Sequence, residues 1–155
     1  GIKDSRFKII KFRTMHTDAE DRLEELLEKN PKLKAEYEIY HKLNDDPRLT
    51  KVGKFLRKFS LDELPQFWNV IKGEMSLIGP RAYIPWEKIK MNGNEDMILQ
   101  VKPGISGLWQ VTDRNESSFE ERIMIDIYYI SNWSMFLDLY ILARTINVVF
   151  TGKGG

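Results

Sequence analysis

Two acidic residues, Asp62 and Glu63, stand side by side in the stretch SLDELPQFWNV, residues 60–70. A carboxylate can attack a phosphoryl group and form a covalent aspartyl-phosphate intermediate. A neighbouring carboxylate can hold Mg²⁺, which prefers oxygen ligands and bridges to substrate phosphates. Arg57 and Lys58 precede the pair, and cations nearby keep a carboxylate ionised and attract phosphate. The pair is therefore a candidate for phosphoryl-transfer chemistry.

A purely structural role accounts for the same residues. Ser60 followed three residues later by Glu63 is the pattern of a capping box, in which each side chain satisfies the other residue's free backbone N–H. Pro65 fits this box poorly because it removes one helical hydrogen bond, whereas with Asp62 as the cap it lies harmlessly in the first turn. In both versions the carboxylates lie at the positive end of a helix, and the spacing alone favours a capping role.

The composition limits the class of protein. With 155 residues, 42% of them hydrophobic and 30% charged, the chain is predicted to fold as one domain over residues 1–155. A net charge of +1 predicts no nucleic-acid partner. The chain has no cysteine, which excludes disulfides, thiol catalysis and cysteine-rich zinc sites. His16 and His41 are far apart without a second ligand at metal spacing, so both are predicted to be surface residues.

No segment has the pattern of a membrane-spanning helix, which needs a run of about 18 or more apolar residues. The chain opens with charged residues from Lys3 onward, so no secretory signal is predicted. The nearest approach to a span is segment 134–150, which Asp138 and Arg144 interrupt. That segment is predicted either to belong to the core or to lie at a membrane surface.

The first part of the chain reads as one strand and two helices. Apolar and basic residues alternate over 10–13, which predicts a short, one-sided strand. Leucines and tyrosines at helical spacing, interrupted by Asn30–Pro31, predict helices over 18–29 and 32–43. Together they would form an exposed, charged hairpin over 18–43, to which we assign no chemistry.

Segment 51–59 is predicted to be a short amphipathic helix. Its apolar residues follow the pattern i, i+3, i+4, i+7, and basic residues fill most of the remaining positions. Such a helix can pack on a core with one wet face, or it can lie on an anionic membrane with its lysines near the headgroups.

The second half supplies irregular backbone and two helices. Glycines and prolines make 73–85 irregular, and 101–111 is predicted to be a loop or tight turn leading into a short strand. Two helices are predicted to meet near Asn132, and the second is apolar on nearly every face, which implies burial or lipid contact. The predicted fold is mostly α with a few short strands (α+β), in a compact single domain.

Four motifs occur in a familiar order and cover nearly the whole chain. They are KFRTM at 11–15, SLDELPQFWNVIKGEMSLIGPR at 60–81, KPGISGLWQV at 102–111 and IDIYYISNWSMFLDLYIL at 125–142. Together they resemble the bacterial sugar transferase family, the monotopic polyprenyl-phosphate phosphoglycosyl transferases. Because four separate motifs match in order, the resemblance is far more specific than a single short pattern.

The resemblance implies a reaction and roles for the acidic pair. Family members transfer a sugar-1-phosphate from a UDP-sugar to polyprenyl (undecaprenyl) phosphate and release UMP. This is the first membrane step of capsule, O-antigen (lipopolysaccharide) or exopolysaccharide assembly. By the match to LDELPQ, Asp62 is expected to be the nucleophile that carries the phospho-sugar, and Glu63 its partner and a Mg²⁺ ligand.

The resemblance also implies substrate-binding residues. Arg81 in GPR is expected to contact a phosphate or the nucleotide, since a guanidinium suits bidentate binding of phosphate oxygens. Arg57 and Arg114 are similar candidates with less support. Asp126 could orient an arginine or the metal, and the remaining two candidates, near phosphates or the membrane face, are Lys11 and Arg13. The alternatives are a surface arginine after a turn for Arg81 and an exposed helical acid for Asp126.

The chain departs from the family pattern in three places. Ala82 stands where the family usually has proline after GPR, and Asp113 stands where a glycine commonly precedes the arginine matched by Arg114. An N-terminal hydrophobic segment that dips into the membrane is expected to precede residue 1. The expected location is therefore the cytoplasmic face of the inner membrane, although the fragment itself can be soluble. In this light the membrane-surface reading of 51–59 is preferred.

Two other functions are compatible with parts of the sequence. A membrane-peripheral scaffold, inactive without its anchor, would bind anionic vesicles regardless of Asp62 or Mg²⁺. A metal-dependent phosphatase would use the same acidic pair and release its product to water without any lipid. Against the phosphatase, no D-x-D arrangement accompanies Asp62 and no water-activating base is visible.

Overall fold

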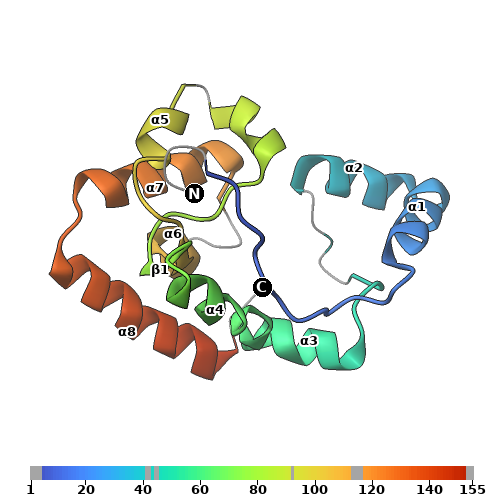
Figure 1. Cartoon of the computed structure of the whole chain (residues 1–155). Helices are drawn as coiled ribbons and strands as arrows, with labels where there is room; N and C mark the ends of the chain where they lie inside the picture. The colour runs from blue at the N-terminus through green and yellow to red at the C-terminus, as the bar shows by residue number, and fades with distance from the viewer. Residues whose placement is uncertain (1–4, 41–42, 44–45, 92, 113–116, 153–155) are drawn as a thin grey trace.

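The protein is described by a computed structural model that covers residues 5–40, 43, 46–91, 93–112 and 117–152 (Figure 1). The chain is mostly helical with two short strands, which confirms the predicted fold class. In chain order the elements are α1 (Ala19–Lys29), α2 (Pro31–Tyr40), α3 (Lys51–Lys58), η2 (Leu61–Glu63), α4 (Gln66–Ile71), β1 (Ser76–Ile78), η3 (Pro85–Met91), α5 (Glu95–Ile98), β2 (Gly104–Ser106), α6 (Leu108–Thr112), α7 (Phe119–Ser131) and α8 (Met135–Thr151). The η elements are short 3₁₀ helices.

The two strands pair in parallel and hold the GPR and GISG segments together. Ser76 lies opposite Gly104, and Ile78 lies opposite Ser106. Only glycine fits at this crossing, because a Cβ atom on Gly104 would lie 2.2 Å from the backbone nitrogen of Gly79. Within 101–111 the predicted strand is present but earlier than expected: it is β2 at Gly104–Ser106, and Leu108–Thr112 form α6.

The core lies between α7 and the elements on either side of it. Two clusters of buried side chains consist of Met91, Ile98 and Ile123, and of Val111, Tyr129 and Ile141. Since α7 supplies Ile123 to one and Tyr129 to the other, this helix joins the two clusters. It begins with a capping box between Ser118 and Glu121.

The N-terminal segment is extended but is not the predicted strand. Residues 5–14 pair with no strand, and the first bridge along the chain is an isolated one between Met15 and Leu49. The segment is bound instead by the fully buried side chain of Asn69. The Asn69 Oδ1 accepts from the Ile10 N–H at 3.2 Å, and its Nδ2 donates to the Lys8 carbonyl at 2.8 Å. A buried amide thus supplies two of the backbone hydrogen bonds that a neighbouring strand would make, and the Asp62 carbonyl accepts another from the Phe12 N–H.

The amphipathic helix predicted over 51–59 is present as α3. Thr50 caps it, with Oγ1 accepting from the Gly53 N–H at 2.8 Å. Gly53 lies against the chain at Thr14, where a Cβ atom would come within 1.9 Å of the Thr14 carbonyl oxygen. The apolar positions Val52 and Phe55 nevertheless remain 67% and 55% exposed, so α3 does not bury its apolar face.

The C-terminal helices α7 and α8 meet at Asn132 as predicted. Along α8 only Ile141 is fully buried, while Phe136 and Phe150 are each 81% exposed. Figure 1 shows α8, α4 and α3 along the lower edge of the view. Among the described helices, none is both long and apolar enough to cross a bilayer. The chain therefore carries apolar surface on several separate helices.

Candidate active site

The turn that carries Asp62 and Glu63 is tighter than a helix start. Ser60 adopts a left-handed conformation, with φ of 53°, and its side chain makes no capping hydrogen bond. One turn of 3₁₀ helix follows, and Pro65 then precedes α4. The capping-box prediction is therefore wrong. Pro65 has no N–H to donate back along the chain, so the segment divides into a 3₁₀ turn and the separate helix α4 instead of continuing as one helix.

The two carboxylates have different surroundings. Glu63 Oε1 forms an ion pair with Lys11 Nζ at 2.7 Å, and this pair links the turn to the N-terminal segment. Asp62 is only 9% exposed, and its backbone carbonyl accepts from the Phe12 N–H at 3.0 Å. Within the described part of the chain, the Asp62 carboxylate has no hydrogen-bond or ion-pair partner. It is a largely buried acid that no neighbouring side chain neutralises.

A cavity of about 630 Å³ lies beside this turn. Among the described residues, its wall carries three cations, Lys11, Arg13 and Arg81, against the one carboxylate of Glu63. The asymmetry favours an anionic ligand, and phosphate groups match it in charge and in hydrogen-bonding capacity. Asp62 itself does not line the cavity, although the next residue in the chain does.

Arg81 is held at two points by two different acids. Its backbone N–H donates to Asp126 Oδ2 at 3.1 Å. Its guanidinium Nη1 donates to both oxygens of Glu87, at 3.0 and 2.8 Å. The sequence prediction that Asp126 could orient an arginine therefore fits the Arg81 backbone, whereas Glu87 binds the side chain.

Asp126 does not line the cavity but binds Arg81, which does. The residue is fully buried, and Tyr83 Oη donates to its Oδ2 at 2.8 Å. Burial raises the pKa of the Asp126 carboxyl to about 6, against the hydrogen bonds from Tyr83 and Arg81, which lower it. Burial and the nearby carboxylate also raise the pKa of Tyr83 well above its ordinary value. The alternative of an exposed helical acid is wrong for Asp126.

The remaining predicted residues lie elsewhere. Arg57 Nε donates to Thr14 Oγ1 at 3.0 Å, and Arg57 does not line the cavity. The structure therefore does not bring Arg57 together with Arg81. Arg114, like Asp113, lies outside the described residues.

Sequence reasoning missed several residues at the cavity. Gln66, Trp109 and Gln110 line it, and Glu87 holds Arg81 from a 3₁₀ helix. Gln66 and Trp109 fall inside the family-like motifs, so a motif could have drawn attention to them. Glu87 has no such signal: it follows Arg81 by six residues across an irregular loop, and no periodicity predicts their contact.

Comparison with known proteins decides the family. The family model described as bacterial sugar transferase matches residues 1–152. The chain belongs to the bacterial sugar transferase family. Its relatives in this family include a UDP-galactose-lipid carrier transferase of Erwinia amylovora, which is 48% identical over 99% of this chain and 32% of its own length.

Two further relatives in the bacterial sugar transferase family also match nearly all of this chain with only part of their own length. An undecaprenyl-phosphate galactose phosphotransferase of Salmonella typhimurium is 45% identical over 99% of this chain and 32% of its own length. The exopolysaccharide production protein ExoY of Sinorhizobium fredii is 42% identical over 99% of this chain and 68% of its own length. The chain thus spans about a third of the longer relatives and two thirds of the shorter one.

The oxygen and nitrogen side chains around the cavity of this family member fit one kind of metal site. No group of three or more metal-binding side chains gathers anywhere in the described residues. An all-protein cage is thus absent from that part of the chain. Mg²⁺, however, is commonly bound by one or two carboxylates together with substrate phosphates and water. Glu63, on the wall of a cationic cavity, fits that mode of binding.

The buried Asp126 predicts a pH-dependent contribution to stability. Its pKa is about 6 in the folded protein and 3.8 in the unfolded chain, so the folded state retains its proton to higher pH. The contribution of Asp126 to the free energy of unfolding is therefore greatest below pH 4 and falls as pH rises through 6. A rise of about two pKa units corresponds to about 3 kcal/mol.

The measurement is urea unfolding of the wild type and of Asp126→Asn between pH 4 and pH 7. Other acids titrate in this range, so the quantity to follow is the difference in free energy of unfolding between the two proteins. That difference should move in favour of the Asn variant as pH rises. If the free energies of unfolding of the two proteins differ by the same amount at every pH, the raised pKa of Asp126 is contradicted.

Proposed function

We propose that this chain contains the catalytic centre of a phosphoglycosyl transferase that moves a sugar-1-phosphate from a UDP-sugar to polyprenyl phosphate. The observation that carries the proposal is the cavity whose wall holds Lys11, Arg13, Arg81 and Glu63. It lies beside the turn of Asp62, whose buried carboxylate has no partner among the described residues. The relatives named for undecaprenyl phosphate, a lipid carrier and exopolysaccharide production support the acceptor and the pathway class.

The proposed chemistry has two displacement steps. An Asp62 carboxylate oxygen attacks the sugar-bearing phosphorus of the UDP-sugar, and the bond from that phosphorus to the bridging oxygen breaks. UMP leaves with this oxygen, and Asp62 carries the sugar-1-phosphate as an acyl phosphate. A phosphate oxygen of the polyprenyl phosphate then attacks the same phosphorus and releases the Asp62 carboxylate. The product is a polyprenyl diphosphate-sugar.

The cavity residues would act mainly by electrostatics. Charge is spread over phosphate oxygens in the transition state, so positioned cations contribute much of the rate acceleration. Arg81 presents a planar fork of donors, and Lys11 and Arg13 add positive charge on the same wall. Mg²⁺ held by Glu63 would neutralise further charge on the donor diphosphate.

The exposed apolar helices support a location at a membrane surface, which we propose to be the cytoplasmic face of the inner membrane. Phe136 and Phe150 on α8 and Val52 on α3 all face outward, and α3 also carries several lysines. Apolar side chains with flanking lysines are the features of helices that lie in an anionic membrane interface. This placement would bring a lipid-borne acceptor to the chain.

The test is the intact mass of the protein after incubation with UDP-sugars and Mg²⁺ in the absence of lipid acceptor. UDP-galactose comes first, because two of the relatives are named for galactose, and UDP-glucose follows. An added sugar-phosphate that disappears on addition of polyprenyl phosphate is the expected result. Vesicle binding without any adduct would favour a peripheral scaffold, and release of sugar-1-phosphate to water would favour a phosphatase.

A further inference from the structure

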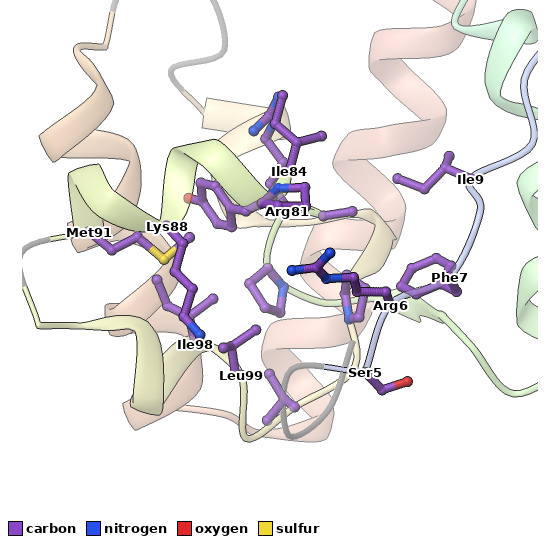
Figure 2. A pocket seen from close by; sticks show the side chains of 16 residues that line it. Ser5, Arg6, Phe7, Ile9, Arg81, Ile84, Lys88, Met91, Ile98 and Leu99 are labelled. Carbon is purple, nitrogen blue, oxygen red and sulfur yellow. The ribbon is translucent and has the colours of Figure 1, made fainter.

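The loop from Arg81 to Ile84 forms a wall shared by two cavities. Besides the cationic cavity, a smaller one of about 240 Å³ is lined by the same loop. Figure 2 shows Ile98 and Leu99 on one side of the smaller cavity, Phe7 and Ile9 on the other, and Arg81 and Ile84 near the top of the view. The conformation of this loop therefore shapes both spaces at once.

Glu87 fixes this loop by accepting hydrogen bonds from both of its ends. Its Oε2 accepts from the Ile84 N–H at 2.9 Å and from Arg81 Nη1 at 2.8 Å, and its Oε1 accepts from the same Nη1 at 3.0 Å. The residue is only 5% exposed, so these bonds are shielded from water. Asp126 holds the Arg81 backbone from below.

The way in which Arg81 is bound leaves part of its guanidinium for a ligand. Among the described residues, Glu87 is the only group that accepts a hydrogen bond from this side chain, and it engages Nη1 alone. The donors on Nε and Nη2 remain for phosphate oxygens, which guanidinium groups bind through two parallel hydrogen bonds. The Arg81 side chain is 30% exposed, so it is accessible from the cavity.

We infer that Glu87 is a positioning residue: it holds the Arg81 guanidinium in the direction that binds the substrate phosphates. The inference rests on the proposed function for the nature of the anion, which would be the diphosphate of the sugar donor. Without the carboxylate, Arg81 would sample other rotamers, and its affinity for an anion would fall with the fraction of molecules in the competent rotamer.

Replacing Glu87 by glutamine weakens the hydrogen bonds that hold the Arg81 guanidinium, with little change in side-chain size. An amide has one oxygen and one NH₂ group, so it cannot accept from Arg81 through both atoms and from Ile84 as well. The NH₂ group would face a donor of the loop. The change also removes a negative charge near the anion site, which by itself would strengthen anion binding. A loss of affinity would therefore show that positioning outweighs net charge.

The experiment is a double-mutant cycle on the affinity for inorganic pyrophosphate, measured by calorimetric titration of the folded protein. Glu87→Gln should weaken binding about ten-fold, which corresponds to about 1.4 kcal/mol. Arg81→Ala should weaken it at least as much. In the Arg81→Ala background, Glu87→Gln should cause no further loss, because Glu87 acts through Arg81. Asp96→Asn, which removes an exposed acid on α5, is the matched control and should bind normally.

Three results would overturn the inference. They are unchanged binding in Glu87→Gln, tighter binding in Glu87→Gln, and losses that add in full in the double mutant. If Glu87→Gln does not fold, Glu87→Asp, which keeps the charge on a side chain too short for both contacts, enters the same cycle. Since pyrophosphate binding needs no turnover, a protein with the expected cycle but no mass adduct would contradict only the proposed function.

Discussion

Asp62→Asn is expected to reduce sugar-phosphate transfer by about a thousand-fold or more, because the amide has no ionised oxygen with which to attack phosphorus. The same variant should form no sugar-phosphate adduct with any UDP-sugar. Turnover with polyprenyl phosphate and intact-protein mass are the two measurements. Together they separate a failed first step from a failed second step, since loss of only the second step would leave the adduct in place.

The fold should survive this change. The Asp62 side chain makes no hydrogen bond or ion pair with the described residues, so an amide of the same shape breaks no contact there. Thermal unfolding should therefore shift by no more than a few degrees. Asp96→Asn is again a suitable control, because it removes an exposed carboxylate away from the cavity. Normal transfer by Asp62→Asn would remove Asp62 from the mechanism.

Glu63→Gln is expected to lower turnover about a hundred-fold and to raise the Mg²⁺ concentration needed for half-maximal rate. Of the described residues on the cavity wall, Glu63 alone carries a carboxylate, and an amide oxygen is a weaker ligand for a hard cation. The measurement is the initial rate of transfer across a Mg²⁺ titration, with the intact mass as a second readout. Chelation of the metal should reduce the wild-type rate to a similar degree.

Lys11→Met distinguishes the ion pair of Glu63 with Lys11 from the proposed binding of Mg²⁺ by Glu63. In the structure Glu63 is paired with Lys11 at 2.7 Å, so Glu63→Gln could act through the loss of this ion pair alone. If metal binding is the role of Glu63, Lys11→Met should keep a strong dependence on Mg²⁺, even where donor binding is weakened. Equal Mg²⁺ profiles for Glu63→Gln and wild type would exclude Glu63 as a metal ligand.

The features that were predictable from sequence are those with a long periodic signal. The helices now seen as α3, α7 and α8 follow from apolar spacing and from the break at Asn132. The turn at Asp62 did not follow from the sequence. The residues that suggest a capping box instead form a 3₁₀ turn after a left-handed Ser60, and Pro65 separates this turn from α4. Local spacing does not distinguish these outcomes.

Features that depend on contacts between distant segments were beyond sequence reasoning. The N-terminal segment alternates like a strand, yet the buried amide of Asn69 and the Asp62 carbonyl, rather than a partner strand, bind its backbone. The contact between Glu87 and Arg81 depends on the path of an irregular loop, and the burial of Asp126 depends on how α7 packs. Candidate residues could be named from motifs, but which of them share one cavity could not.

The attachment of the N-terminal segment through Asn69 has a consequence for how ligands reach the cavity. The segment contributes Lys11 and Arg13 to the cavity wall, but it is bound by a few side-chain and turn contacts and not by a strand ladder. Moving it aside would break those contacts and leave both core clusters intact. The free energy of opening this wall is therefore expected to lie well below that of global unfolding, so a bulky substrate could enter while the helices stay folded.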